Sequence, residues 1–259
     1  MTMNEAKPIG ADFEPADTGS VGDGKLPLLE KSRGRTEAEI RRRILQAIFE
    51  QRLPAGESIT EEQLAATFDV SRTVVRQAVA RLAQDGILVK SPNKGTTVAS
   101  PSRKEARDIL FVRRLVEPEI VRVLASAPHK FGLVELRKHI AEENEARLAG
   151  QRGTLVRLTG EFHLLLAELS GNQVLRRLMT QLQTLTCLAV LLYAEHDDAC
   201  PRDEHLRIVD AIAAGDGAAA AQEMLRHLTH VEKDLKLDRA TPESSFDDAM
   251  GWLRGASDR

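Results

Sequence analysis

The stretch that decides the fold is Val70-Ser-Arg-Thr-Val-Val-Arg-Gln-Ala-Val-Ala-Arg-Leu82, closed by Asp85-Gly-Ile-Leu88. Its apolar residues recur at the spacing of an amphipathic helix, at Val75, Ala78, Val79 and Leu82. Ser71 occupies the place of an N-cap residue, and Gly86 stands where a helix commonly ends. The pattern predicts a helix from Ser71 to about Asp85 that buries one side and exposes a polar one.

Two shorter helical patterns precede this helix. The first starts near Thr36, where Thr36 and Glu39 fit a capping box, and it stops before the loop Leu53-Pro-Ala-Gly56. The second starts at Thr60, which forms another capping box with Gln63. Three helices in this order, with a tight turn before the third, are typical of a helix-turn-helix that places its last helix in the major groove of DNA.

A predicted hairpin follows the third helix. Two β-like runs, at 87–90 and 96–99, flank the turn Ser91-Pro-Asn-Lys-Gly95. Three helices followed by a small hairpin are the layout of a winged helix-turn-helix. We therefore expect a mainly α chain with a winged helix-turn-helix at residues 35–102.

The polar side of the predicted third helix carries Arg72, Thr73 and Arg76. Arginine can contact guanine or a phosphate with two N–H groups, and threonine can reach either. In the wing, Lys94 and the bare Gly95 can approach the DNA backbone or the minor groove. Any one of these arginines also fits a plain solvated helix face, but their combination with the helix order and the wing favours DNA binding.

The composition excludes several classes of protein. The chain has 259 residues, of which 42% are hydrophobic and only 3% aromatic, a mixture that favours helices over a β-sandwich or barrel. Cys187 and Cys200 are too few for a disulfide scaffold or a Cys-based zinc finger. No apolar run approaches about 18 residues and the N-terminus lacks a signal-peptide pattern, so we expect no membrane span and a cytoplasmic location.

Charge is divided unevenly along the chain. Residues 33–104 contain 13 Lys and Arg against 8 Asp and Glu, a net +5, which leaves −8 for the remainder of a chain whose total is −3. A basic front part that faces an anionic partner is one interpretation, and chance clustering is the other.

Residues 103–238 are expected to form an all-α bundle. Short breaks separate six helical patterns, so neighbouring helices should pack antiparallel. The expected helices are 103–127, 132–149, 153–169, 172–195, 202–214 and 216–237. Residues 1–34 are predicted to be a disordered tail, and residues 239–259 a tail or a short docking helix.

Three of the seven histidines lie on apolar faces of these predicted helices: His163, His205 and His227. Three imidazoles that converge in the core of a bundle could bind Zn²⁺, Ni²⁺ or a similar metal. Buried histidines that only form hydrogen bonds are the alternative.

The motifs of the first part resemble the GntR family of bacterial regulators. They are Leu53-Pro-Ala-Gly-Glu, Glu62-Gln-Leu-Ala, the stretch from Val70 to Leu82, and Asp85-Gly-Ile-Leu. The resemblance covers residues 36–100 and implies DNA contacts at Arg72, Thr73, Arg76 and Gly95. Val74 replaces a usual proline, and Glu62 replaces a basic residue that often assists DNA contact in FadR-type members.

The second part resembles the FCD ligand-binding domain of the FadR branch, over about residues 105–230. The supporting phrases are Val112-Arg-Arg-Leu-Val-Glu-Pro-Glu, Phe162-His163, Ser170-Gly-Asn172, His205-Leu-Arg-Ile-Val-Asp-Ala-Ile and His227-Leu228. Many FCD domains hold a metal with one Asp and three His, and the histidines match His163, His205 and His227. Thr159 stands where the Asp is expected. The resemblance thus implies either a three-His site for Zn or Ni, completed by waters or a ligand carboxylate, or a metal-free pocket.

The same resemblance implies a pocket for an effector. Arg113 matches an arginine that commonly faces the pocket and could bind a carboxylate with two N–H groups; an intrahelical pair with Glu117 is the alternative. Thr159 belongs to the same pocket. Asn172 either lines it or caps the helix that it begins.

The leading interpretation is a transcriptional regulator, expected to be a repressor and a homodimer on a pseudo-palindromic double-stranded DNA operator. A small carboxylate bound in the helical part would change its operator affinity. A metal-dependent hydrolase that uses the His cluster, and a DNA-binding protein that responds to no ligand, are the alternatives. The chain has no His-Glu-x-x-His motif and no evident general base beside the histidines, which disfavours an enzyme.

Overall fold

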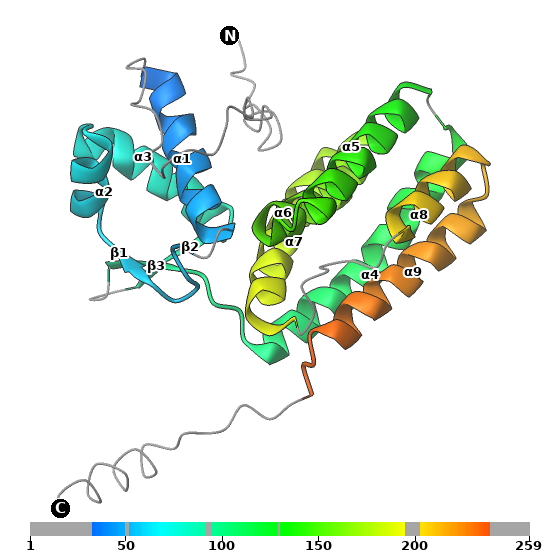
Figure 1. Cartoon of the computed structure of the whole chain (residues 1–259). Coiled ribbons are helices and arrows are strands. Elements are labelled where there is room, and N and C mark those ends of the chain that lie inside the picture. Colours follow the sequence, from blue (N-terminus) through cyan, green and yellow to red (C-terminus); the bar gives the residue numbers. More distant parts are fainter. Residues whose placement is uncertain (1–32, 50–51, 92–94, 129, 195–202, 239–259) are drawn as a thin grey trace, which may run out of the picture.

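The computed structural model of the chain describes residues 33–49, 52–91, 95–128, 130–194 and 203–238. These residues form two parts, a small N-terminal unit with a three-stranded sheet and a larger bundle of helices (Figure 1). The arrangement confirms the mainly α fold, a winged helix-turn-helix followed by an all-helical bundle. Most of the predicted N-terminal tail, the predicted tail 239–259 and the wing residue Lys94 lie outside the described residues.

The N-terminal unit is the winged helix. Its elements are α1 (Arg33–Phe49), β1 (Ser58–Ile59), α2 (Glu61–Phe68), α3 (Arg72–Gln84), β2 (Leu88–Ser91) and β3 (Gly95–Val98). Helix α3 buries the four apolar residues that its periodicity predicted, and they share one core with Ile40 and Ile44 of α1. Gly86 follows α3 with φ +75°, in the left-handed region that favours glycine.

The predicted helix caps are confirmed only in part. The Thr60 hydroxyl accepts a hydrogen bond from the Gln63 N–H at 3.1 Å, and the Gln63 side chain accepts one from the Thr60 N–H at 2.9 Å, which completes that capping box. The predicted box at Thr36 is wrong, because α1 begins at Arg33 and Thr36 lies buried inside the helix. Ser71 precedes α3, but its side chain makes no capping bond.

Strand β3 lies in the middle of the sheet, in the order β1-β3-β2, and both pairings are antiparallel. Ser91 pairs with Gly95 across the wing turn, and Ser58 pairs with Thr97. Strand β1 was not expected, because two residues are too few for an alternating pattern to show in the sequence. This strand ties the segment before α2 to the wing.

The larger part is an antiparallel bundle. Its helices are α4 (Arg103–Ser126), α5 (Lys130–Leu148), α6 (Arg152–Leu169), α7 (Gln173–Tyr193), α8 (Glu204–Ala213) and α9 (Gly217–Asp234). All of them were predicted, with ends within about three residues. Phe162, Met179 and Ile208 are among the residues of its core. No helix in the described ranges is both long and apolar enough to cross a membrane.

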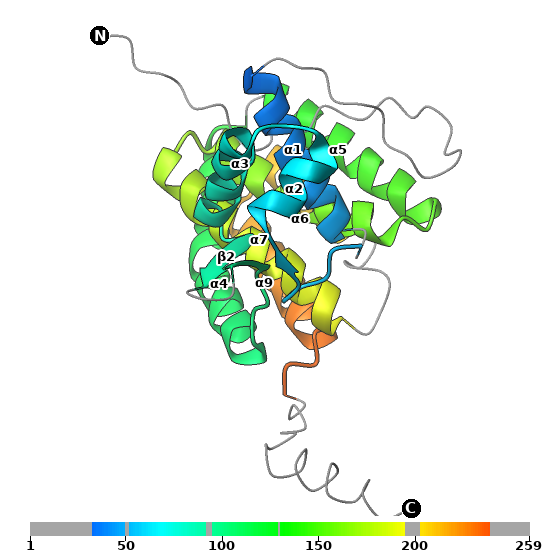
Figure 2. The ribbon, with the colours of Figure 1, turned by 90° about the vertical axis from the view of Figure 1, so that its left-hand side faces the viewer.

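Helix α7 joins the two parts. Its Leu188 is buried in the core of the winged helix, and Leu185 packs against the same core. The Tyr193 hydroxyl donates to the Pro101 carbonyl at 2.8 Å, and the Arg103 guanidinium lies 4.5 Å from the Tyr193 ring centroid. Helix α7 therefore contacts both the winged helix and the segment that links it to the bundle. Figure 2 views the molecule from the winged-helix side, with the bundle behind.

Candidate functional site

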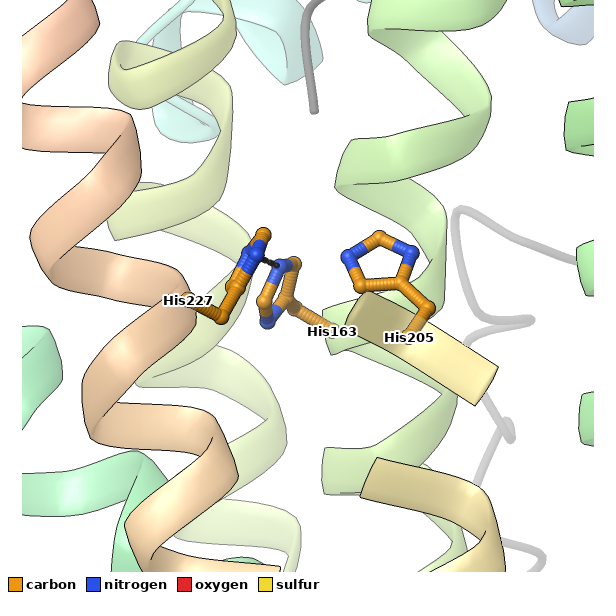
Figure 3. Close-up of side chains that lie close together, drawn as sticks. All are labelled: His163, His205 and His227. Atoms are coloured by element: carbon orange, nitrogen blue, oxygen red, sulfur yellow. Dashed lines mark hydrogen bonds between the residues drawn. The ribbon is translucent and has the colours of Figure 1, made fainter. Parts of the chain in front are cut away.

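Three helices bring three histidines together inside the bundle. His163 lies on α6, His205 on α8 and His227 on α9, and each is at most 3% exposed (Figure 3). Their ligand nitrogens lie within 4.8 Å of one another, and Nε2 of His163 lies 3.2 Å from Nε2 of His227. The Phe162 ring stacks on the His205 imidazole, with centroids 3.9 Å apart. The structure thus brings together the three histidines that the sequence singled out.

Each histidine of this cluster is oriented by a buried glutamate that contacts Nδ1. The pairs are His163 with Glu117 at 2.5 Å, His205 with Glu143 at 2.9 Å, and His227 with Glu204 at 2.9 Å. An ionised carboxylate accepts hydrogen bonds, so beside an ionised glutamate Nδ1 of a neutral ring carries the proton and Nε2 keeps the lone pair. Carboxylate–histidine pairs of this kind commonly support histidines that bind a metal.

The contact between the two Nε2 atoms fits a metal better than a hydrogen bond. Burial lowers the pKa of His163 to about 3, against the opposing effect of Glu117, so this ring does not hold a second proton at neutral pH. Burial also lowers the pKa of His205 well below its ordinary value. In a tetrahedral site with metal–nitrogen bonds of about 2.0–2.1 Å, two ligand nitrogens lie about 3.3 Å apart. The spacing between His163 and His227 therefore suits a divalent ion.

Arg113 of α4 is a buried cation next to the cluster. Its side chain is 1% exposed, and its Nε donates to Glu117 at 2.5 Å. Burial alone would raise the pKa of Glu117, but the charge of Arg113 and the contact with His163 outweigh it and hold that pKa well below its usual range. The intrahelical pair that the sequence allowed therefore forms.

A small cavity lies beside the histidines. Its volume of about 20 Å³ gives room for about one water molecule. Its polar lining consists of Arg113, Thr159, His163, Gln183, Thr186, Cys187 and His227. Two buried lining atoms, Nη2 of Arg113 and Oε1 of Gln183, have no hydrogen-bond partner in the described part of the chain. Arg113 thus pairs with Glu117 and also lines the cavity, and its binding of a carboxylate stays a prediction.

The other two predicted effector residues differ in position. Thr159 lines the cavity, and its hydroxyl donates to the Val156 carbonyl at 3.0 Å. Asn172 is exposed and does not line the cavity; its side chain accepts hydrogen bonds from the N–H groups of Val174 and Leu175 at 3.0 and 3.2 Å. Of the two roles considered for Asn172, the structure shows the helix cap.

The three glutamates are the site residues that the sequence analysis missed. Glu117 was considered only as a partner of Arg113, and Glu143 and Glu204 were not considered. A signal for Glu143 was present, because it follows Leu136 and Ile140 on one buried helical stripe. Burial raises the pKa of Glu143 to about 7, against the opposing charges around it.

The predicted DNA-contact residues lie on the surface of the winged helix. Arg72, Thr73 and Arg76 are exposed on α3. Nε of Arg76 donates to Glu61 of α2 at 3.1 Å while the arginine side chain stays 63% exposed, so the guanidinium is oriented and still accessible. Gly95 is exposed at the start of β3 with φ +76°.

This fold defines the class of the protein: a helix-turn-helix regulator with a separate helical domain. Two family models match the chain, "Bacterial regulatory proteins, gntR family" at residues 36–98 and "FCD domain" at residues 108–230. The chain is 30% identical over 192 residues to the HTH-type transcriptional regulator YdhC of Bacillus subtilis (strain 168), covering 73% of this chain and 86% of YdhC. The chain therefore belongs to the GntR family of transcriptional regulators and carries an FCD domain.

Further relatives and solved structures are similar to this chain as well. The HTH-type transcriptional repressor RspR of Escherichia coli (strain K12) is 25% identical over 185 residues, 70% of this chain and 80% of RspR. A transcriptional regulator GntR from Rhodococcus sp. RHA1 superposes with a TM-score of 0.68 at 22% identity, over 81% of this chain and 99% of that one. E. coli McbR/YncC superposes with a TM-score of 0.66 at 17% identity, over 78% of this chain and 98% of that one. The relatives are transcriptional regulators, and members of the family bind DNA operators, typically as dimers.

Proposed function

We propose that the chain is a transcriptional repressor whose operator affinity is controlled by a small carboxylate, bound in the bundle beside a divalent metal. His163, His205 and His227 would hold the metal, and Arg113 would hold the carboxylate. The observation that carries the proposal is that His163, His227 and the unpaired Nη2 of Arg113 belong to one buried cavity.

The donor chemistry supports the metal. Three neutral imidazole nitrogens suit Zn²⁺ or Ni²⁺. Because Thr159 replaces a carboxylate, the three histidines leave coordination positions for water or for a ligand oxygen. Three buried glutamates contact the rings, and two of them, Glu117 and Glu204, have lowered pKa values and therefore offset part of the ion's charge. When bound, the metal supplies a Lewis acid that can hold a carboxylate oxygen.

Arg113 supplies a second anchor for an anion. A hydrogen bond from a guanidinium to a carboxylate is stronger than one between neutral groups, and stronger still away from water. Glu117 holds Nε of Arg113, so the guanidinium is oriented before a ligand arrives. A ligand carboxylate would also satisfy Nη2, a buried donor that otherwise lacks a partner.

We expect small carboxylates to raise the thermal unfolding midpoint of the full-length protein, and EDTA to reduce that rise, because ligands that bind the folded state stabilise it by mass action. Arg113→Lys should weaken carboxylate binding about tenfold or more, since lysine has no second, planar N–H group that can reach a ligand while the first stays on Glu117. Arg122→Lys, at an exposed position of the same helix, is the matched control. A thermal-shift series with acetate, glycolate, lactate and propionate measures this. No stabilisation of the wild type by any carboxylate would refute the effector site.

Helix α7 supplies a physical route from the cavity to the DNA-binding unit. Gln183 and Cys187 line the cavity, while Leu185 and Leu188 pack into the winged helix. A cavity of about 20 Å³ cannot accept a ligand of several heavy atoms unless its walls move. Helices α6 and α7 are in close contact there, because a Cβ on Gly160 would lie 2.5 Å from Sγ of Cys187. A ligand that separates these helices therefore changes the support of the winged helix.

Replacing Leu188 with alanine tests this route. The side chain is 3% exposed, so we expect the free energy of unfolding to fall by about 2–4 kcal/mol. We also expect a carboxylate to change operator affinity less than in the wild type, because the contact that transmits the shift is loosened. Fluorescence anisotropy with and without lactate measures the response. Leu192→Ala, at a 39% exposed position one turn further on, is the control. A full response in Leu188→Ala would exclude α7 as the route.

For DNA, we propose that two copies bind a pseudo-palindromic operator as a homodimer. Each copy would place α3 in the major groove, with half-sites about 34–36 Å apart. The contacts would come from Arg72, Thr73 and Arg76 of α3 and from the wing at Lys94 and Gly95. The exposed side chains on α3 and the orientation of Arg76 by Glu61 support this part of the proposal.

A further inference from the structure

Some polar groups that line the cavity have hydrogen-bond partners within the chain, and others have none. The Thr159 hydroxyl donates to the Val156 carbonyl at 3.0 Å, and the Thr186 hydroxyl donates to the Leu182 carbonyl at 2.8 Å. Apart from the imidazole nitrogens assigned to the proposed metal, two fully buried lining atoms of the described chain have no hydrogen-bond partner: the donor Nη2 of Arg113 and the acceptor Oε1 of Gln183. Gln183 is only 5% exposed and Arg113 1%. Unpaired buried polar atoms are costly, so this donor and acceptor indicate what the cavity binds.

The orientation of the Gln183 amide follows from its neighbour. Burial raises the pKa of the Cys187 thiol to about 12, so the thiol stays protonated. It donates to the Val156 carbonyl at 3.6 Å, which leaves the sulfur lone pairs as acceptors. Nε2 of Gln183 lies 3.8 Å from that sulfur and donates to it. The amide oxygen, rather than the amide nitrogen, is therefore the group left for a ligand.

We propose that Gln183 determines ligand specificity by accepting a hydrogen bond from a hydroxyl group of the bound carboxylate, so that the site selects small hydroxycarboxylates over their deoxy analogues. This inference rests on the proposed carboxylate site. The ligand carboxylate accepts from Arg113 and its hydroxyl donates to Gln183, which satisfies both unpaired atoms at once. An ammonium group would also donate to Gln183, but the buried charge of Arg113 in the same cavity disfavours a second cation there.

The lining also limits the size of the ligand. Val156, Val190 and Val231 form apolar walls of the cavity. Apart from the imidazole nitrogens assigned to the metal, the buried atoms of this lining offer no further unpaired group for a second hydroxyl among the described residues. The site therefore suits an acid with few carbons and a single hydroxyl close to the carboxylate. A site built to pair a hydroxyl rejects the analogue without it, because its acceptor then stays buried and unpaired.

The test compares two matched pairs of acids, glycolate with acetate and lactate with propionate, by isothermal titration calorimetry on the full-length protein as purified. We expect the wild type to bind each hydroxy acid about tenfold or more tightly than its partner. Gln183→Met keeps the size of the side chain and removes the acceptor, so the ratio should fall to about twofold or less. Gln181→Met, at an exposed position of α7, should behave as the wild type.

A second variant distinguishes the loss of the hydrogen bond from a change in packing. It also provides a test if Gln183→Met does not fold. Gln183→Glu keeps an acceptor oxygen, so the preference for hydroxy acids should persist even if its charge weakens the binding of every acid. The role of Gln183 would be overturned if the wild type bound the two acids of a pair with affinities within about twofold of each other. It would also be overturned if folded Gln183→Met kept the preference for hydroxy acids. Either result would leave the proposed carboxylate site in place. No binding of any of the four acids to the wild type would overturn both.

Discussion

Replacing His205 with alanine is expected to reduce bound metal from about one ion per chain to nearly none. The ring is buried at 3% exposure, and its Nδ1 contacts Glu143 at 2.9 Å. In the described structure the cluster contains only two other residues, His163 and His227, so no fourth side chain of the cluster can replace His205 as a ligand. Loss of a residue that merely supports a ligand commonly costs about 10–100-fold in metal affinity, and loss of a ligand itself costs at least as much. Elemental analysis after dialysis against Zn²⁺ or Ni²⁺, followed by competition with a chelator, measures the change.

His230→Gln is the matched control for this experiment. His230 is 39% exposed and contacts Glu204, but it does not belong to the cluster. Glutamine keeps a donor toward Glu204, so we expect metal content close to that of the wild type. Circular dichroism and thermal unfolding establish that both variants are folded. Equal metal content in His205→Ala and the wild type, or no metal in the wild type after loading, would show that the cluster is not a metal site.

Replacing Arg76 with alanine is expected to weaken operator binding by about 10–100-fold, corresponding to about 1–3 kcal/mol for the loss of one arginine contact. The arginine is 63% exposed on α3, and Glu61 fixes its guanidinium through Nε. If Arg76 contacts a base, the loss is confined to the specific sequence; if it contacts a phosphate, affinity falls for all duplexes and the salt slope decreases by about one. Anisotropy titrations at several salt concentrations, with specific and random duplexes, separate the two cases.

Arg122→Ala is the control for the loss of positive charge. Arg122 is 49% exposed on α4, in the bundle, where its nearest ion pair is with Glu119. Its removal should leave operator affinity within about twofold, since distant exposed charges are screened at physiological salt. Undiminished binding by Arg76→Ala would place the DNA interface elsewhere on the chain.

Much of the fold was predictable because its signals are local. The apolar spacing from Val75 to Leu82 predicted α3, and Thr60 with Gln63 predicted the start of α2. One local pattern misplaced the start of a helix. Thr36 with Glu39 matches a capping box, but α1 continues three residues further toward the N-terminus. Strand β1 forms only through pairing with β3, which no local pattern encodes.

Of the candidate site, the sequence predicted the three histidines and two residues that line the cavity, Arg113 and Thr159. Three histidines on apolar helix faces are conspicuous in a sequence, whereas Glu143 looks like any other charged residue. Its role comes from the packing of α5 against α8, which places its carboxylate on Nδ1 of His205. Gln183 was missed for the same reason, because α7 turns it toward Cys187 and the cavity. Such contacts depend on tertiary packing, beyond the reach of periodicity in one segment.

We propose that a carboxylate and a metal in the bundle together control operator binding. The most direct measurement is the affinity of metal-loaded, full-length protein for an operator selected from a random duplex library, with and without glycolate or lactate. We expect at least one of these acids to weaken operator binding about tenfold or more, and EDTA-treated protein to lose that response. Operator affinity that stays the same with and without these acids in the metal-loaded protein would contradict the account.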